Sequence, residues 1–154
     1  EEQCHPANSF DVVVMSMVLE HLYNPFQTLK KITQWIKPEG ELLFSIPYFE
    51  GMEFGIFKKY SYGLQLPHHV MFFNKHIIKE LLSDLGYKDV RFYFHHFDRD
   101  AVVSSQYKCQ DTNQWIYHLL GYNRVVRMVL VKPMVFILSL FGKTSRVTIV
   151  ATKK

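Results

Sequence analysis

The residues best suited to acid–base chemistry are Glu20 and His21, which follow an apolar run in the sequence. An imidazole with a pKa near neutrality can accept a proton from a hydroxyl or an amine, and a carboxylate can orient that imidazole. Adjacent residues on a helix do not face each other, so a hydrogen-bonded Glu20–His21 pair is not expected. Two interpretations stay open: His21 serves as a catalytic base, or both residues cap and pack a turn.

A second candidate group comprises Tyr48, Tyr60, Tyr62, His68 and His69, on a glycine-punctuated aromatic segment that runs from residue 48 to residue 73. Loops of this length in compact domains are often functional, and we expect a lid or a pocket wall. Aromatic rings with polar tips would suit an aromatic or lipid acceptor. The alternative is that these rings only hold the loop in place.

The cysteines and paired histidines do not predict a metal site. Cys4 and Cys109 lie far apart and outside the spacings typical of zinc ligands, which predicts two reduced thiols. His95 and His96 fall on a predicted strand, where neighbouring side chains point to opposite faces and cannot share an ion. We therefore expect no bound metal.

The candidate residues must be positioned by elements that the apolar pattern predicts. Residues 10–17 form a β-branched apolar run, which indicates a strand buried on both faces of a parallel sheet. Asn24 and the proline after it are typical of a helix start, and residues 37–40, Lys-Pro-Glu-Gly, are expected to end that helix. A second buried strand is predicted at 41–46, ended by Pro47. This order predicts a parallel pair with a right-handed crossover.

The rest of the chain predicts further alternating elements. The expected order is a helix capped by Asn74, a strand at 90–97, a polar bridge at 98–110, a helix at 113–122, an apolar helix from Arg124 broken near Pro133, and a last strand at 146–151. With 154 residues, 48% of them hydrophobic, the chain predicts one globular domain, 1–154, with a helical insertion at about 110–142. No nucleic-acid-binding motif accompanies the formal charge of +4, so nucleic acid is not an expected partner.

Several motifs, in a fixed order, resemble the class I S-adenosylmethionine-dependent methyltransferase family. They are Ser9-Phe10-Asp11-Val12-Val13-Val14 with Val18-Leu19-Glu20-His21, the run from Ile36 to Pro47, Pro67-His68-His69, and the closing strand from Val147. The resemblance covers most of the chain and is densest over 9–47 and 67–87. It implies an α/β fold with a Rossmann-like methyltransferase sheet, present in part as C-terminal strands four to seven, and flanking helices.

The resemblance also implies a cofactor, S-adenosyl-L-methionine, and a site for it. In this family the end of the fourth strand lines the cofactor, which corresponds to Ser16, Met17 and Val18 here, and acceptor-binding residues lie on the segment equivalent to 48–73. The family's glycine-rich turn and the acidic residue that holds the ribose are not found in this sequence. We therefore expect a truncated domain that binds the cofactor poorly by itself.

The segment 124–141 is apolar with sparse basic residues. Such a segment is typical of a helical insertion that covers the sheet or the acceptor pocket, or of peripheral contact with an anionic membrane or a protein. Arg127, Lys132 and Pro133 argue against a membrane span, and the N-terminus carries no export signal. We expect a cytoplasmic protein, with peripheral membrane contact through 124–141 as one alternative.

Three functions are consistent with these features to different degrees. The first is methyl transfer to a small-molecule or lipid-like acceptor by the full-length parent enzyme, and the second is a non-catalytic methyltransferase-like binding or interaction module. A nicotinamide-dependent oxidoreductase is disfavoured because the sequence has no GxGxxG and no Tyr-x-x-x-Lys pattern. Apolar strands in a partial sheet would leave edges unpaired, so the isolated chain is expected to form a dimer or larger homo-oligomer.

Overall fold

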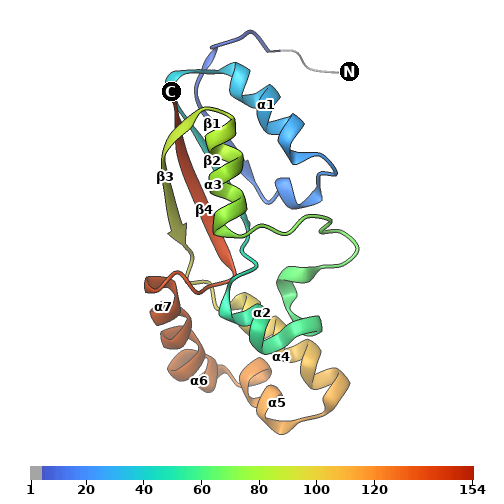
Figure 1. Cartoon of the computed structure of the whole chain (residues 1–154). Coiled ribbons are helices and arrows are strands. Elements are labelled where there is room, and N and C mark those ends of the chain that lie inside the picture. Colours follow the sequence, from blue (N-terminus) through green and yellow to red (C-terminus); the bar gives the residue numbers. More distant parts are fainter. Residues whose placement is uncertain (1–4) are drawn as a thin grey trace. The chain divides into compact units, whose positions relative to one another are not determined.

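The computed structural model describes residues 5–154 and contains a four-stranded sheet in the order β1-β2-β4-β3 (Figure 1). The strands are β1, Phe10–Ser16; β2, Ile36–Pro47; β3, Tyr87–Phe94; and β4, Arg146–Lys153. β1 and β2 pair in parallel, as the strand–helix–strand pattern predicts. The predicted α/β class and partial Rossmann-like sheet with flanking helices are confirmed.

The helices fall between these strands and follow β3. They are α1, Pro25–Trp35; α2, Met52–Phe57; α3, Lys75–Asp84; α4, Arg99–Thr112; α5, Trp115–Tyr122; α6, Arg124–Val126; and α7, Lys132–Leu140. Single 3₁₀ turns occupy Leu19–His21, Lys58–Tyr60 and Tyr62–Leu64, and a π-helical turn occupies Arg127–Val131.

The chain divides into two compact units. The sheet unit comprises Glu1–Ile46, Val70–Tyr93 and Thr148–Lys154, and the helical unit comprises Pro47–His69 and Phe94–Val147. The expectation of a single domain stays a prediction.

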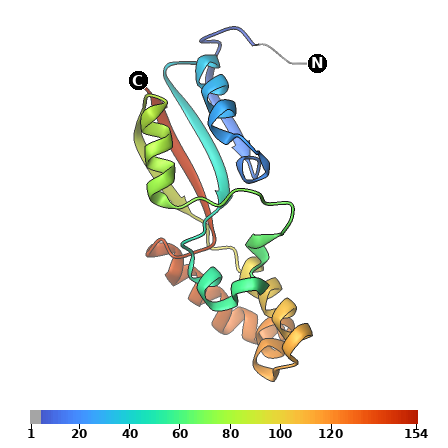
Figure 2. The same ribbon diagram turned by 45° about the vertical axis from the view of Figure 1, so that its right-hand side comes forward.

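Two asparagine caps position the helices of the sheet unit, as predicted. The Asn24 side chain accepts a hydrogen bond from the Gln27 N–H at 3.1 Å, and the Asn74 side chain accepts one from the Ile77 N–H at 2.8 Å. Each bond satisfies a donor that the first helical turn leaves unpaired. Figures 1 and 2 show α1 and α3, the helices so capped, flanking the sheet.

β1 is less buried than the sequence predicts. Val12 is 48% exposed and Val14 is 67% exposed, whereas Leu42 and Phe44 in β2 are essentially inaccessible. The reason is position: β1 is an edge strand that pairs only with β2 in the described sheet, and the side chains on one of its faces meet no covering layer there. The prediction of burial on both faces is therefore wrong for β1.

The predicted stop at 37–40 is also wrong, because β2 begins at Ile36, directly after α1. The register moves from Phe10 opposite Ile36 to Val12 opposite Glu41, so residues 37–40 form a bulge within the strand. Gly40 is required there, since a Cβ at this position would lie 2.8 Å from the Asp11 carbonyl oxygen. At the other end, Pro47 closes the strand as predicted.

The helical unit contains more helix than the sequence predicts. The segment 48–73 holds α2 and two 3₁₀ turns, and the predicted polar bridge 98–110 is α4. Its apolar period is obscured because Ser104 and Ser105 are buried, each donating its hydroxyl hydrogen to the carbonyl four residues earlier, at 2.6 and 2.8 Å. Phe57, Ala101, Val102, Val131 and Val135 form the core of this unit.

The helical run after Arg124 is widened rather than interrupted. The π turn 127–131 lies directly before Pro133, whose ring nitrogen cannot donate to the helix ladder. In the described part of the chain, no helix combines the length and apolar character needed to cross a membrane.

Candidate functional site

The predicted cofactor residues lie at the carboxyl end of β1, in the sheet unit. Ser16 is the last residue of the strand, and the Met17 N–H donates to the Ser45 carbonyl at 2.9 Å. Met17 has a positive φ of 53°, so the chain turns sharply there, and Val18 is 39% exposed. Ligands of open α/β sheets bind outside the carboxyl ends of strands, which is where this turn exposes its backbone.

Glu20 and His21 follow on the 3₁₀ turn 19–21, and the two side chains have different environments. Glu20 is 1% exposed, whereas His21 is exposed. The Glu20 carbonyl accepts hydrogen bonds from the Val70 and Met71 N–H groups, at 2.8 and 3.2 Å. The turn is thereby tied to the segment that precedes α3, and the imidazole of His21 remains on the surface.

Tyr48 lies in the helical unit and is 4% exposed. Its hydroxyl donates to a Glu50 carboxylate oxygen at 2.5 Å, and its ring contacts Phe94 edge-on with a centroid distance of 5.3 Å. Burial, with the Glu50 carboxylate beside it, raises the pKa of the Tyr48 hydroxyl above its ordinary value. Tyr48 therefore stays protonated and acts as a hydrogen-bond donor, not as a base.

The other four predicted acceptor residues, Tyr60, Tyr62, His68 and His69, belong to the same unit. The Tyr60 hydroxyl donates to the Asp111 carboxylate, which Lys59 also contacts at 3.3 Å. His69 is buried and its Nδ1 donates to the Gly63 carbonyl at 2.8 Å, while His68 is exposed. The contacts of Tyr60 and His69 match the alternative in which these rings hold the segment in place.

Two hollows in the helical unit are lined by residues that lie close to these in the sequence. One, of about 550 Å³, is lined by Phe49, Glu50, Gly51, Met52, Gly55, Ile56 and Lys143. The other, of about 350 Å³, is lined by Lys59, Ser61, Tyr62, Leu64, Gln65, Leu66 and Tyr107. These volumes fall in the range of small-molecule sites. Of the five predicted acceptor residues, Tyr62 lines the second hollow and none lines the first. The exposed Met52 and Ile56, which line the first hollow, are not predicted because the sequence pattern favours polar aromatic side chains.

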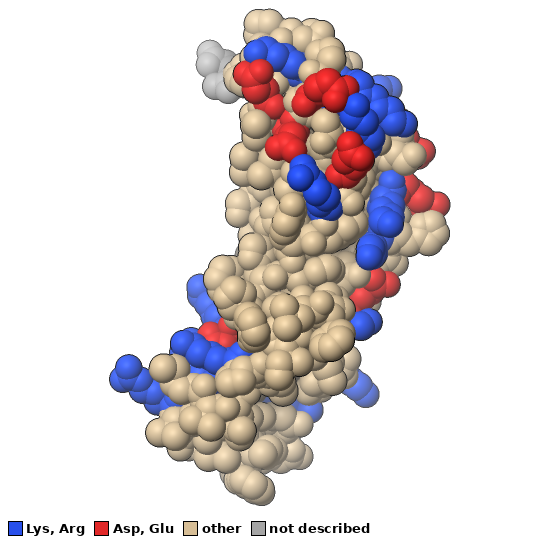
Figure 3. All heavy atoms as spheres, turned by 90° about the vertical axis from the view of Figure 1, so that its left-hand side faces the viewer, with Lys and Arg blue, Asp and Glu red and all other residues tan. Residues whose placement is uncertain are grey.

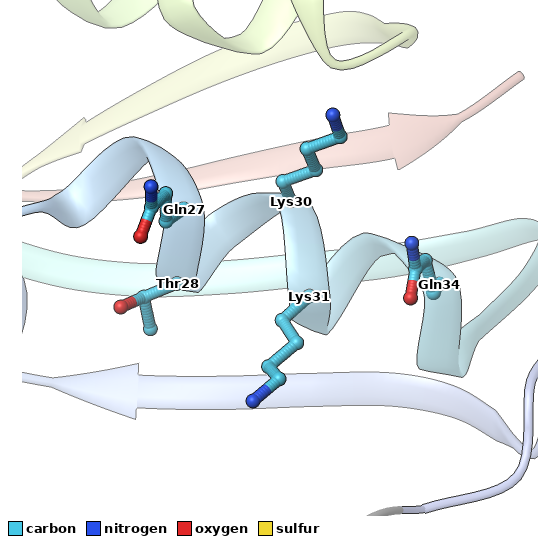
Figure 4. Close-up of a pocket in the computed structure, with 5 residues that line it drawn as sticks. All are labelled: Gln27, Thr28, Lys30, Lys31 and Gln34. Atoms are coloured by element: carbon cyan, nitrogen blue, oxygen red, sulfur yellow. The ribbon is translucent and has the colours of Figure 1, made fainter.

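A third hollow, of about 400 Å³, lies over α1 (Figure 4). Its lining residues, Gln27, Thr28, Lys30, Lys31 and Gln34, all come from that one helix. Figure 4 shows Lys30 and Lys31 pointing to opposite sides of the helix, so they do not converge on a ligand. This hollow has the character of a solvated helix face.

Two buried carboxylates lie in the helical unit and were not anticipated. Asp100 is 2% exposed and accepts hydrogen bonds from the Ser145 hydroxyl and, at 2.8 and 3.0 Å, from the Arg146 guanidinium. Glu53 is 3% exposed, and neither of its oxygens has a hydrogen-bond partner. Burial raises the pKa of Glu53 to about 7, with the negative charge of Asp100 adding to the shift and nearby Ser145 and Arg146 partly offsetting it. Glu53 is thus poised to titrate near neutral pH.

Of the two cysteines, Cys109 is a free, buried thiol in α4, and Cys4 lies outside the described residues. The predicted reduced state of Cys109 therefore agrees with its surroundings.

Comparison with known families identifies the family of the chain from its first 91 residues. A sequence profile for a methyltransferase domain matches residues 1–91, more than half of the chain. The chain belongs to the class I methyltransferase family. The resemblance of its motifs to that family is confirmed, and residues 16–18 and His21 of this methyltransferase chain lie inside the matched region. A search of curated proteins by sequence found no significant match.

Solved structures share the fold of the methyltransferase chain. A Thermotoga maritima S-adenosylmethionine-dependent methyltransferase, described as a possible histamine N-methyltransferase, aligns with TM-score 0.56 and 17% identity, over 97% of this chain and 58% of its own. A Haemonchus contortus phosphoethanolamine N-methyltransferase 2 in complex with S-adenosyl-L-methionine aligns with TM-score 0.53 and 18% identity, over 96% and 34%. The [4+2]-cyclase SpnF aligns with TM-score 0.56 and 13% identity, over 99% and 52%. The chain thus spans between 34% and 58% of the length of these proteins.

Proposed function

We propose that the protein transfers a methyl group from S-adenosylmethionine to a small-molecule or lipid-like acceptor. The observation that carries this proposal is the family match over residues 1–91, which includes the exposed turn after β1. The family is S-adenosylmethionine-dependent, and one of the aligned structures holds that cofactor. The [4+2]-cyclase among the aligned structures shows that the fold alone does not fix the chemistry, so the family match carries more weight.

The residues after β1 fit one side of the proposed cofactor. Ser16 offers a hydroxyl, and the positive φ at Met17 turns the chain at the strand end. Apolar Met17 and Val18 suit contact with the thioether part of the cofactor, whereas none of the three residues offers a charged group for its ribose or its amino acid moiety. We therefore assign these residues a packing role in cofactor binding.

When bound, S-adenosylmethionine would supply an electrophilic methyl group, and the chain's residues would hold the acceptor in line with it. Positioning of this kind can account for a large part of the rate of a bimolecular transfer. His21, with its exposed imidazole beside the strand end, is our candidate to take the acceptor's proton. Within the helical unit, and considered by itself, the apolar hollow at Met52 and Ile56 is our candidate for binding the apolar part of an acceptor.

The first test is calorimetric titration of S-adenosylmethionine and S-adenosylhomocysteine into this chain and into the product of its whole reading frame. Binding by either protein with micromolar affinity supports the proposal. Binding by neither, with both proteins folded, favours the second candidate, a non-catalytic methyltransferase-like module.

A substitution at Met17 tests the assigned packing role without a folding penalty. Glycine tolerates the positive φ of residue 17, so Met17→Gly removes the side chain while relieving the backbone. We expect cofactor affinity to fall about tenfold, which corresponds to the binding free energy of roughly one buried apolar side-chain contact. The melting temperature should be unchanged. Met71→Gly, in the neighbouring segment, is the matched control for loss of a methionine. Equal affinities for Met17→Gly and the parent protein would remove Met17 from the site.

A further inference from the structure

The helical run from Arg124 to Leu140 buries only a narrow side of its surface. α6, the π turn and α7 follow one another without a gap. Val131 and Val135, four residues apart, are buried against Phe57, Ala101 and Val102 of the helical unit's core. A helix attached through so narrow a stripe would normally present polar residues on its other sides.

The other sides of this run are apolar and exposed. We define the apolar face as Val125, Val129, Leu130, Ile137, Leu140 and Phe141, whose exposed fractions range from 53 to 73%. Trp115 of α5, in the same unit, is 75% exposed. Figure 3 shows the part of the molecule that contains α6 and α7 as a broad tan surface, with Lys, Arg and acidic side chains at its margin. Contiguous apolar surfaces of this kind mark interaction sites.

The charge pattern identifies the kind of partner. From Thr112 to Lys154 the sequence has no aspartate or glutamate, but it has seven lysines and arginines. Arg124, Lys132 and Lys143 lie within or directly after the run and are exposed, whereas Arg127 is paired with Asp98 at 2.6 Å. A second copy of this face would bring like charges together. An anionic lipid surface instead complements both the apolar residues and the cations.

We propose that the apolar face binds the surface of an anionic lipid bilayer, as a peripheral contact. The apolar side chains enter the boundary between headgroups and acyl chains, and Arg124, Lys132 and Lys143 contact lipid phosphates. Exposed aromatic residues such as Trp115 and Phe141 are typical of that boundary. The contact does not require the protein to be a methyltransferase, so its test is independent of cofactor binding.

The test is co-sedimentation of the full chain with vesicles. Phosphatidylcholine vesicles are compared with vesicles of equal parts phosphatidylcholine and phosphatidylglycerol, at low and at physiological salt. We expect binding to the mixed vesicles, and about tenfold or more weaker binding after Arg124→Gln with Lys132→Gln, since each cation contributes on the order of 1 kcal/mol near an anionic surface. Equal binding to both kinds of vesicle would overturn the role of charge, and no binding by folded protein would overturn the proposal.

A pair of matched double variants tests the apolar face itself. Val129→Ser with Leu140→Ser removes two of its side chains without adding charge, and we expect about tenfold weaker vesicle binding. Tyr23→Ser with Ile77→Ser, at exposed positions of the sheet unit, should leave binding unchanged. Circular dichroism and thermal unfolding verify that both proteins fold. If the first double variant instead turns an oligomer into a monomer and vesicle binding is absent, a second copy is the occupant and the lipid proposal is wrong.

The two tryptophans provide a direct measure of depth. Trp35→Phe leaves Trp115 as the remaining tryptophan, and Trp115→Phe leaves Trp35 at the end of α1. Vesicles with brominated acyl chains should quench Trp115 strongly and Trp35 weakly. Equal or reversed quenching would place another surface on the membrane and contradict the proposal.

Discussion

At the scale of single residues, the most informative group is the carboxylate of Glu53. It is buried without a hydrogen-bond partner, and its pKa of about 7 lies above the ordinary value of 4.5. Because the folded state holds the proton more tightly than the unfolded state, this group does not reduce stability below about pH 4.5. Between pH 4.5 and pH 7 the buried carboxylate increasingly lowers the free energy of unfolding, and above pH 7 this effect is fully present.

Glu53→Gln should therefore stabilise the protein at alkaline pH. We expect the free energy of unfolding to rise by about 2 kcal/mol at pH 8 and by less at pH 5. The pKa difference between 4.5 and about 7 corresponds to roughly 3 kcal/mol before the desolvation of the amide itself is counted. Urea unfolding at the two pH values measures this difference. Asp84→Asn, at an exposed position of α3, is the control and should have no such pH dependence. The same effect of Glu53→Gln at both pH values would mean that Glu53 does not titrate in this range.

At the scale of elements, the Asp100 carboxylate joins the start of α4 to the start of β4. It is 2% exposed and bonded to Ser145 and Arg146, whereas the comparable pair of Asp98 and Arg127 leaves the arginine side chain 43% exposed. Loss of one partner from a buried ion pair leaves the other charge uncompensated. Asp100→Ala should thus cost about 3 kcal/mol, and Asp98→Ala about 1 kcal/mol, in urea unfolding. Equal costs would show that burial does not distinguish the two pairs.

The exposed edge of β1 leads to a prediction about assembly. Val14 is 67% exposed on a strand whose outer edge has no partner in the described sheet, and apolar edges of this kind promote pairing between chains. We expect the isolated chain to be a dimer or larger by light scattering at micromolar concentration. Val14→Lys should lower that mass because charge on an edge strand opposes pairing, whereas Val14→Thr should not. A monomeric parent chain would contradict this expectation.

The elements show what sequence patterns can and cannot predict. The caps at Asn24 and Asn74 and the stop at Pro47 were predictable because each depends on local chemistry. Helix α4 was missed because its buried serines satisfy their hydroxyls within the helix, which hides the apolar period. The exposure of Val12 and Val14 depends on the position of β1 in the sheet, which an apolar run does not report.

At the scale of the whole molecule, the family predicted from the sequence is confirmed, whereas the cofactor and acceptor residues stay predictions. Tyr48, Tyr60 and His69 were chosen for their polar aromatic character, and each uses that character in an internal hydrogen bond. The residues that line the nearest hollow, such as Met52, Ile56 and Lys143, come together where the Met52 N–H donates to the Lys143 carbonyl, at 2.8 Å. A contact across ninety residues leaves no local pattern in the sequence.

Lys143, which accepts this hydrogen bond, also lies close in the sequence to the proposed membrane surface. Lys143 lines the hollow and lies two residues after Phe141, which is 73% exposed. If the apolar face rests on a bilayer, a lipid-like acceptor could pass from the membrane into the hollow without crossing water. This route depends on both proposals, the methyl transfer and the lipid contact, and the hollow offers a way to test it separately from either.

Gly55 provides the test, because a Cβ added there meets nothing within 4 Å and points into open space. Gly55→Ala and Gly55→Leu should fill the hollow in two steps while adding helix propensity to α2, worth up to about 1 kcal/mol. We expect the KM for a vesicle-borne acceptor to rise from Ala to Leu, with cofactor affinity and vesicle binding unchanged and the melting temperature equal or higher. A stepwise rise in the acceptor's KM, with no other change, would show that the acceptor binds in the hollow. Unchanged KM for Gly55→Leu would exclude the hollow, and a parallel loss of vesicle binding would mean that the substitution acts on the membrane contact instead.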